Sequence, residues 1–143
     1  MVGITIGNGA HQFRGVFDGD NDQVLNLYVN RNDDAAGLFG YVGQGGVVRN
    51  GHVVDGDISG TYWCGGIADR NSNGFVENCY NRGDVYIRNR ARGYGGGVVG
   101  ENTASSTVDN YYSTGSVEGS LACGAIAGAN GEGSTVQDCY YPR

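Results

Sequence analysis

The chain has 143 residues, of which 28 are glycine and one is proline, and all nine basic residues are arginine. The formal net charge of −6 argues against a general nucleic-acid binder, because such proteins carry a basic surface. No apolar stretch approaches the length of a membrane-spanning helix, so we expect no membrane insertion. The first residues do not have the pattern of a signal peptide. Frequent glycine with tyrosine, valine and asparagine favours short strands and tight turns over helices.

An internal repeat runs through the chain. Residues 15–19 and 24–29 form a leading copy, and similar paired blocks then begin at 36, 64, 96 and 123. Repeat periods of this length indicate a solenoid, and the short alternating apolar runs favour strands. We therefore predict one all-β domain over residues 1–143, a parallel β-solenoid (β-helix) of about five coils of 24–32 residues. Residues 1–35 are expected to form a leading coil or N-terminal cap, and residues 36–143 four repeats.

Aligning the repeats gives columns of equivalent residues, which we expect to stack from coil to coil. The inward column is Val24, Val48, Val76, Val108 and Val136. In the other block we align Phe39, Ile67, Val98 and Ile126, each two residues after a glycine.

A polar column lies two residues after the valines: Asn26, Asn50, Asn78, Asn110 and Asp138. Stacked amides can hydrogen-bond between coils, so we interpret this column as a structural ladder, with a row of ligand-binding amides as the alternative. The next column is Tyr28, His52, Tyr80, Tyr112 and Tyr140. Tyr80 and Tyr112 are candidates for ring contacts with a sugar, and packing between coils is the alternative.

The blocks at 37–46 (GLFGYVGQGG) and 78–85 (NCYNRGDV), with the approach at 13–29, resemble the GLUG-motif repeat family. That family occurs in large bacterial surface and secreted proteins, including adhesin-like proteins. The resemblance implies a right-handed parallel β-solenoid, an extracellular or cell-surface location and no intrinsic reaction. The chain departs from the family pattern at Asp20, Asn21 and Asp22, which make the first turn unusually acidic.

The four cysteines occupy two columns, and the coils that contain one contain the other. This pattern predicts disulfides Cys64–Cys79 and Cys123–Cys139, and hence an oxidising compartment. The alternative is four buried free thiols that act as small apolar residues.

Two charged segments are further candidate sites. Asp18, Asp20 and Asp22 form an oxygen-rich turn that could hold calcium if Asp33 and Asp34 fold back, and a solvated acidic turn is the alternative. Arg88, Arg90 and Arg92 alternate, so in an extended segment all three would face the same way and could hold an anionic glycan. The alternative for the arginines is a solvated loop.

One further column contains Arg49, Glu77, Asp109 and Gln137, in which we expect Arg49 to pair with Glu77 across coils. Repulsion between Glu77 and Asp109 could be relieved by a cation. With only two histidines and no nucleophile or metal motif, catalysis is the weakest hypothesis, and no cofactor other than calcium is indicated.

The resulting prediction is a non-catalytic, extracellular structural or adhesive module whose side-chain ladders contact a cell-surface glycan or protein. The alternative is a subunit that binds itself, by end-to-end stacking of coils into a fibre.

Overall fold

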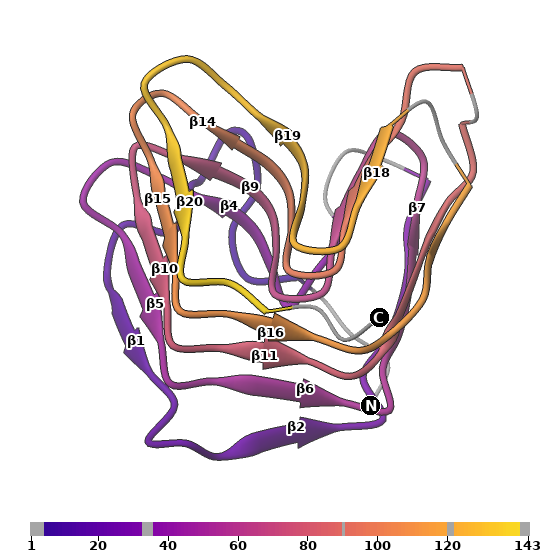
Figure 1. Cartoon of the computed structure of the whole chain (residues 1–143), viewed down its shortest axis with the longest axis horizontal. Helices are drawn as coiled ribbons and strands as arrows, with labels where there is room; N and C mark the ends of the chain where they lie inside the picture. Colours follow the sequence, from indigo (N-terminus) through magenta and orange to yellow (C-terminus); the bar gives the residue numbers. More distant parts are fainter. Residues whose placement is uncertain (1–4, 33–35, 90, 120–121, 141–143) are drawn as a thin grey trace.

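A computed structural model describes residues 5–32, 36–89, 91–119 and 122–140. All regular structure in these residues is β-strand, and every strand pairing is parallel. Each coil contributes one strand to each of several flat sheets, which we number I to V in the order that the chain follows (Figure 1). The sheets contain five, four, four, three and four strands, so the solenoid has about four turns rather than the five coils expected.

The strands of sheet I are β1 (Val16–Asp18), β5 (Val47–Arg49), β10 (Phe75–Glu77), β15 (Thr107–Asp109) and β20 (Thr135–Gln137). Those of sheet II are β2 (Gln23–Leu25), β6 (His52–Val54), β11 (Tyr80–Asn81) and β16 (Tyr112–Ser113). Those of sheet III are β3 (Tyr28–Asn30), β7 (Asp57–Gly60), β12 (Asp84–Ile87) and β17 (Val117–Glu118).

The strands of sheet IV are β8 (Trp63–Gly65), β13 (Tyr94–Gly96) and β18 (Ala122–Gly124). Those of sheet V are β4 (Phe39–Val42), β9 (Ala68–Ser72), β14 (Val99–Thr103) and β19 (Ala127–Asn130). Sheets I, II and III form three sides of the coil, whereas IV and V fold inward between them (Figure 1).

The inward fold depends on glycines at its turn. A Cβ added to Gly96 would lie 1.8 Å from the carbonyl oxygen of Val99, and one added to Gly97 would lie 2.1 Å from that of Ala125. The turn also packs against sheet II, because Asn81 donates its side-chain amide to the Gly97 carbonyl at 2.8 Å. The repeated glycines of the first block are therefore required by close backbone approach.

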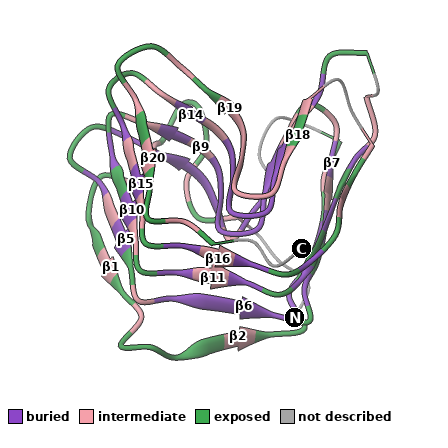
Figure 2. Cartoon of the chain, viewed as in Figure 1, coloured by how far each residue is buried: buried purple, intermediate pink, exposed green. Residues whose placement is uncertain are grey.

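The core follows the inward columns. Val48, Val76 and Val108 stack in register in sheet I and are fully buried. Figure 2 shows this burial in the middle coils, whereas the first and last coils are more exposed. The N-terminal segment lies beside β4 through bridges from Ile6 to Phe39 and from Phe13 to Val42.

The register of the first coil differs from the sequence alignment. Val48 pairs with Phe17, whereas Val24 pairs with Val53 in sheet II. Phe39 likewise pairs with Ala68, whereas the sequence alignment places Phe39 opposite Ile67. The alignment by valine failed because sheets I and II both have valine in their inward columns, so a shift from one to the other keeps the hydrophobic pattern.

Candidate functional site

The bend between sheets I and II is built from one type of residue. Asn50, Asn78, Asn110 and Asp138 have φ values of 53°, 57°, 57° and 48°, which is the left-handed region. Asn and Asp tolerate this conformation better than other non-glycine residues, so their repetition at the bend has a backbone cause.

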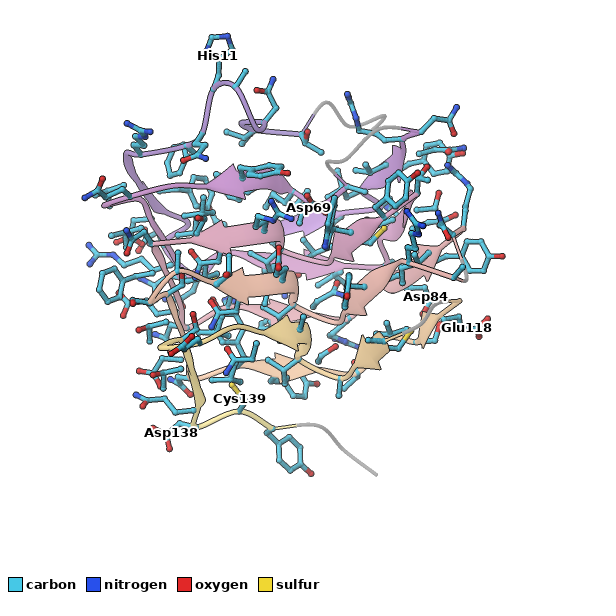
Figure 3. The ribbon with its side chains drawn as sticks, turned by 90° about the horizontal axis from the view of Figure 1, so that it is seen from above. His11, Asp69, Asp84, Glu118, Asp138 and Cys139 are labelled. Carbon is cyan, nitrogen blue, oxygen red and sulfur yellow. The ribbon has the colours of Figure 1, made fainter. Side chains whose placement is uncertain are left out.

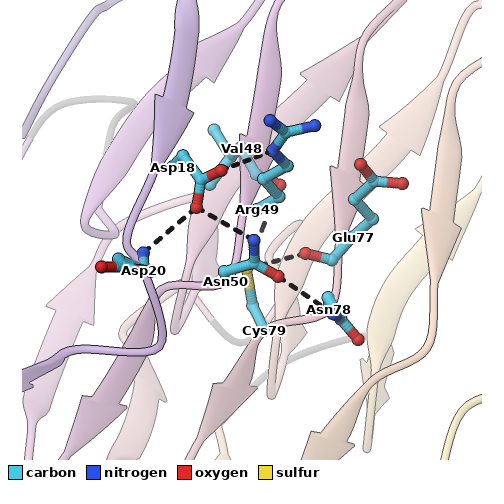
Figure 4. Close-up of polar contacts among 8 residues, drawn as sticks. All are labelled: Asp18, Asp20, Val48, Arg49, Asn50, Glu77, Asn78 and Cys79. Atoms are coloured by element: carbon cyan, nitrogen blue, oxygen red, sulfur yellow. Dashed lines mark hydrogen bonds and ion pairs between the residues drawn. The ribbon is translucent and has the colours of Figure 1, made fainter.

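The side chains at this bend form a ladder along the solenoid (Figure 4). Asn78 donates to Oδ1 of Asn50 at 2.9 Å, and Asn50 donates to Oδ1 of Asp18 at 2.9 Å. Asn110 continues the ladder by donating to Asn78. Asp138 lies in the same column, but a carboxylate has no proton to donate to Asn110.

The first rung of the ladder is Asp18 and not Asn26. Asn26 follows β2, at the bend between sheets II and III, where its backbone N–H donates to the Val54 carbonyl at 3.0 Å. It also has a positive φ, of 54°. The same local requirement for a left-handed residue therefore operates at two bends, which explains why the sequence alignment merged them.

An acidic column lies beside the amide ladder on sheet I. Asp18, Arg49, Glu77, Asp109 and Gln137 occupy successive rungs. Arg49 forms an ion pair with Asp18 at 2.9 Å, so the expected pairing with Glu77 is not formed. Side-chain hydrogen bonding from Asn50, with further bonds from the Asp20 backbone and Arg49, lowers the pKa of Asp18.

Glu77 and Asp109 are the acidic residues of this column that form no ion pair within the described part of the chain. They are direct neighbours in parallel register, and Oδ1 of Asp109 is shielded from solvent without a hydrogen-bond partner in the described structure. The acidic column and the ladder together line an open cavity of about 440 Å³. Its lining is rich in acceptors and has a net negative charge.

The aromatic column lies on the other side of the ladder, on sheet II. The His52 and Tyr80 rings are stacked with centroids 3.9 Å apart, and Tyr80 meets Tyr112 edge-on at 5.6 Å. Tyr112 and Tyr140 are 6.5 Å apart and nearly parallel. Burial lowers the pKa of His52, which favours its neutral form.

A second cavity, of about 330 Å³, lies over the aromatic column and shares Asn78 and Asn110 with the acidic one. Carboxylates, amides and aromatic rings therefore form one surface around the bend. We call this surface the ladder corner: Asp18, Arg49, Glu77, Asp109, the amides Asn50, Asn78 and Asn110, and the rings of His52, Tyr80, Tyr112 and Tyr140. Such a surface offers acceptors for hydroxyl and amine groups beside flat apolar faces.

The proposed calcium turn is not gathered around a common centre. No group of three or more Asp, Glu, His or Cys residues within the described ranges is arranged to hold a metal ion. Asp18 accepts from Asn50, Arg49 and the Asp20 backbone. Asp20 and Asp22 are exposed, and Asp33 and Asp34 lie outside the described residues.

The described residues of the arginine segment form a turn after β12 and do not continue as an extended strand, which a common orientation of Arg88 and Arg92 would require. Strand β12 ends at Ile87, and Asn89 accepts from the backbone of Ala91 and Arg92 in a turn. The Arg88 guanidinium donates to the side chains of Asn30, Asn32 and Ser59 and to the Arg31 carbonyl. These hydrogen bonds link its own coil to the preceding coils. Arg92 is exposed, and Arg90 lies outside the described residues.

The four cysteines are free thiols, so neither predicted disulfide is formed. Cys64 belongs to β8 and donates to the Tyr86 carbonyl, whereas Cys79 lies at the ladder corner beside the Glu77 carbonyl. The members of this predicted pair are thus on different sides of one coil. Burial, with a contribution from Asp69, raises the pKa of Cys64 to about 12, and burial also raises that of Cys79. These two thiols are packing groups.

A second ladder, inside the core, was not identified from the sequence. Asn71 donates to Asn102 at 3.0 Å, and Asn102 donates to Asn130 at 2.8 Å. Asn71 and Asn102 are fully buried. The signal was present, because each of these residues lies four positions after Ile67, Val98 or Ile126.

Comparisons with protein-family models, curated proteins and solved structures returned no match to this chain. No helix within the described residues is long and apolar enough to cross a membrane.

Proposed function

We propose that this protein is a non-catalytic, extracellular adhesive module of the GLUG-repeat type that binds a cell-surface glycan at the ladder corner. The observation that carries the proposal is the shared lining of the two cavities, which places carboxylates, amides and tyrosine rings on one face. Sugars bind proteins through hydroxyl hydrogen bonds and through ring faces, and this corner supplies both kinds of contact.

The charge of the corner selects among glycans. Among the described residues that line the acidic cavity, Arg49 is the only cation, and its ion pair with Asp18 leaves Glu77 and Asp109 without a counter-charge in that lining. Sulfated and carboxylated chains would be repelled by these groups. We therefore propose a neutral or amine-bearing glycan, in place of the anionic glycan that the arginine segment had suggested.

The solenoid supports this role through rigidity. Neighbouring rungs of parallel strands are about 4.8 Å apart, so equivalent side chains repeat regularly along the axis. A linear glycan that runs along the ladder could make the same contact at successive sugars. Repetition of weak contacts raises the overall affinity without a deep pocket.

The test is binding of the purified chain to an array that contains neutral, amine-bearing and sulfated glycans. Tyr80→Ala and Tyr112→Ala should weaken binding about tenfold, since an aromatic contact contributes about 1–1.5 kcal/mol. Tyr86→Ala is the matched control, because Tyr86 is exposed on sheet III, away from the corner. Binding confined to sulfated glycans, or unchanged by both corner variants, would refute the proposal.

A further inference from the structure

The two ends of the solenoid expose the cross-section of its core. The partly buried apolar side chains that pack against the core are Phe13, Phe17, Val24 and Leu38 at the N-terminal end, and Val117, Ile126, Ala127, Val136 and Cys139 at the C-terminal end. Val136 is only half-buried, whereas Val108 in the same column of the preceding coil is fully buried. From Ser116 to Tyr140 no described residue is buried.

The backbone is open at the same places. Strands β17, β18, β19 and β20 each pair on one side only within the described residues, as do β1, β2 and β3 at the other end. Unpaired edge strands are templates for pairing with another chain. Both ends thus combine unpaired backbone with apolar side chains, and the two cross-sections belong to the same repeating coil.

Charge distinguishes which ends can meet. The described residues from 114 to 140 contain Glu118, Glu132 and Asp138 and no arginine. Figure 3 shows Asp138 at this end of the stack and His11 at the opposite end. Two C-terminal ends placed face to face would bring like charges together, which disfavours a closed tail-to-tail dimer.

Continuation of the register onto a second copy gives a better match. Glu118 shares a column with Tyr86, Ser59 and Asn30, so it would lie beside Asn30 and Arg31 of the next copy.

Glu132 lies in the turn between β19 and β20, and Arg14 lies in the corresponding but shorter turn between Phe13 and β1 in the first coil. Head-to-tail stacking would therefore bring Glu118 and Glu132 of one copy near arginines of the next copy.

The ladder corner is the exception. Gln137 would lie opposite Asp18 of the next copy, and Asp138 would lie diagonally beside Asp18, as Asn50 does within the chain. Neither carboxylate can donate a hydrogen bond to the other. The repulsion between these two carboxylates opposes stacking, so a substitution that removes one of the charges should strengthen stacking.

We propose that the C-terminal end of the solenoid is an interaction surface for the N-terminal end of a second copy. The interface is heterologous, since different surfaces meet, so repeated association extends into a filament and does not close into a dimer. The added copy would pair the edge strands and bury the exposed core residues of both ends.

The experiment is sedimentation velocity of the full chain over a concentration series, with negative-stain microscopy of the concentrated samples. Wild-type protein should form species larger than dimers that lengthen with concentration. Glu132→Arg and Arg14→Glu should each raise the dissociation constant roughly fivefold, as for a surface ion pair, and the double variant should recover part of the loss. Asp138→Asn should lower the dissociation constant, because it removes the acidic repulsion.

Asp57→Asn is the matched control, since it removes one exposed acidic group from a middle coil. A variant that only destabilised the last coil would weaken association. The tighter association expected for Asp138→Asn therefore distinguishes the proposal from such destabilisation. A chain that stays monomeric at all concentrations would overturn the proposal. A dimer that does not grow, and that ignores Arg14→Glu, would overturn the head-to-tail arrangement.

Discussion

Asn71 donates its side-chain amide to Oδ1 of Asn102 at 3.0 Å within a core otherwise built mainly from aliphatic and thiol side chains. Asn102 in turn donates to Asn130 at 2.8 Å and to the Thr135 carbonyl at 3.1 Å. One amide therefore joins three coils. A buried polar ladder of this kind fixes the register of the coils, because a slipped coil would leave its amides unpaired.

Asn102→Ala should lower the free energy of unfolding by about 2 kcal/mol, because it removes the buried hydrogen bonds that the Asn102 side chain makes with Asn71, Asn130 and the Ser106 and Thr135 carbonyls. Asn130→Ala is the matched control at the exposed end of the same ladder, and it should lower the free energy by under about 1 kcal/mol. Urea unfolding followed by circular dichroism measures both. Equal effects of the two variants would contradict the buried role of Asn102.

Gly96→Ala should destabilise the protein by about 3 kcal/mol, because the inward turn leaves no room for a methyl group. The added Cβ would lie 1.8 Å from the Val99 carbonyl oxygen. Gly9→Ala is the control, since the nearest atom to its Cβ is 3.8 Å away. Thermal unfolding compares the two, and a Gly96→Ala variant as stable as Gly9→Ala would show that the turn is looser than described.

The thiols should titrate as four free groups in the unfolded chain without added reductant. In the folded chain Cys123, which is exposed, should react with a thiol reagent first. Cys64 and Cys79 should react only as fast as the protein opens, because they are buried and burial raises the pKa of both. Recovery of fewer than four thiols after unfolding would instead indicate a disulfide.

The pH dependence of stability should reflect Asp18. Its pKa is lowered from 3.8 in the folded protein, mainly by the hydrogen bond from Asn50, so the ionised form stabilises the fold. That contribution is complete above the unfolded value and is lost as the pH falls through the lower folded value. The stability difference between wild type and Asp18→Asn should therefore be constant near neutrality and shrink below pH 3.8.

A carbon-detected NMR titration of the Asp18 carboxyl checks the cause directly. A midpoint at or above 3.8 would contradict the hydrogen-bonded ladder at its first rung.

The fold was predictable because the sequence repeats its backbone requirements. Val48, Val76 and Val108 mark one inward column, and the asparagines that follow two residues later mark a left-handed bend. Repetition identifies a solenoid even where each block is short. Register in the first coil was not predictable in this way, because Val24 and Asn26 satisfy the same pattern one sheet further along.

The candidate site was predictable only in part. The columns that contain Tyr80, Glu77 and Asn78 could be read from the repeat, but their proximity around one bend depends on the angle between sheets I and II. Arg88 was misjudged because its acceptors, such as Asn30, lie far away in the sequence. The cysteine pairs were misjudged because co-occurrence in a coil does not give the distance across it.

The most direct test of glycan binding at the ladder corner is an NMR titration of the isotope-labelled chain with the best neutral or amine-bearing glycan from the array. Binding there should give chemical-shift changes concentrated at Glu77, Asn78, Tyr80, Asp109 and Tyr112, with little change at Tyr86 on sheet III. Shifts centred on sheet III or on the Arg88 turn, or no shifts at saturating glycan, would contradict binding at the ladder corner.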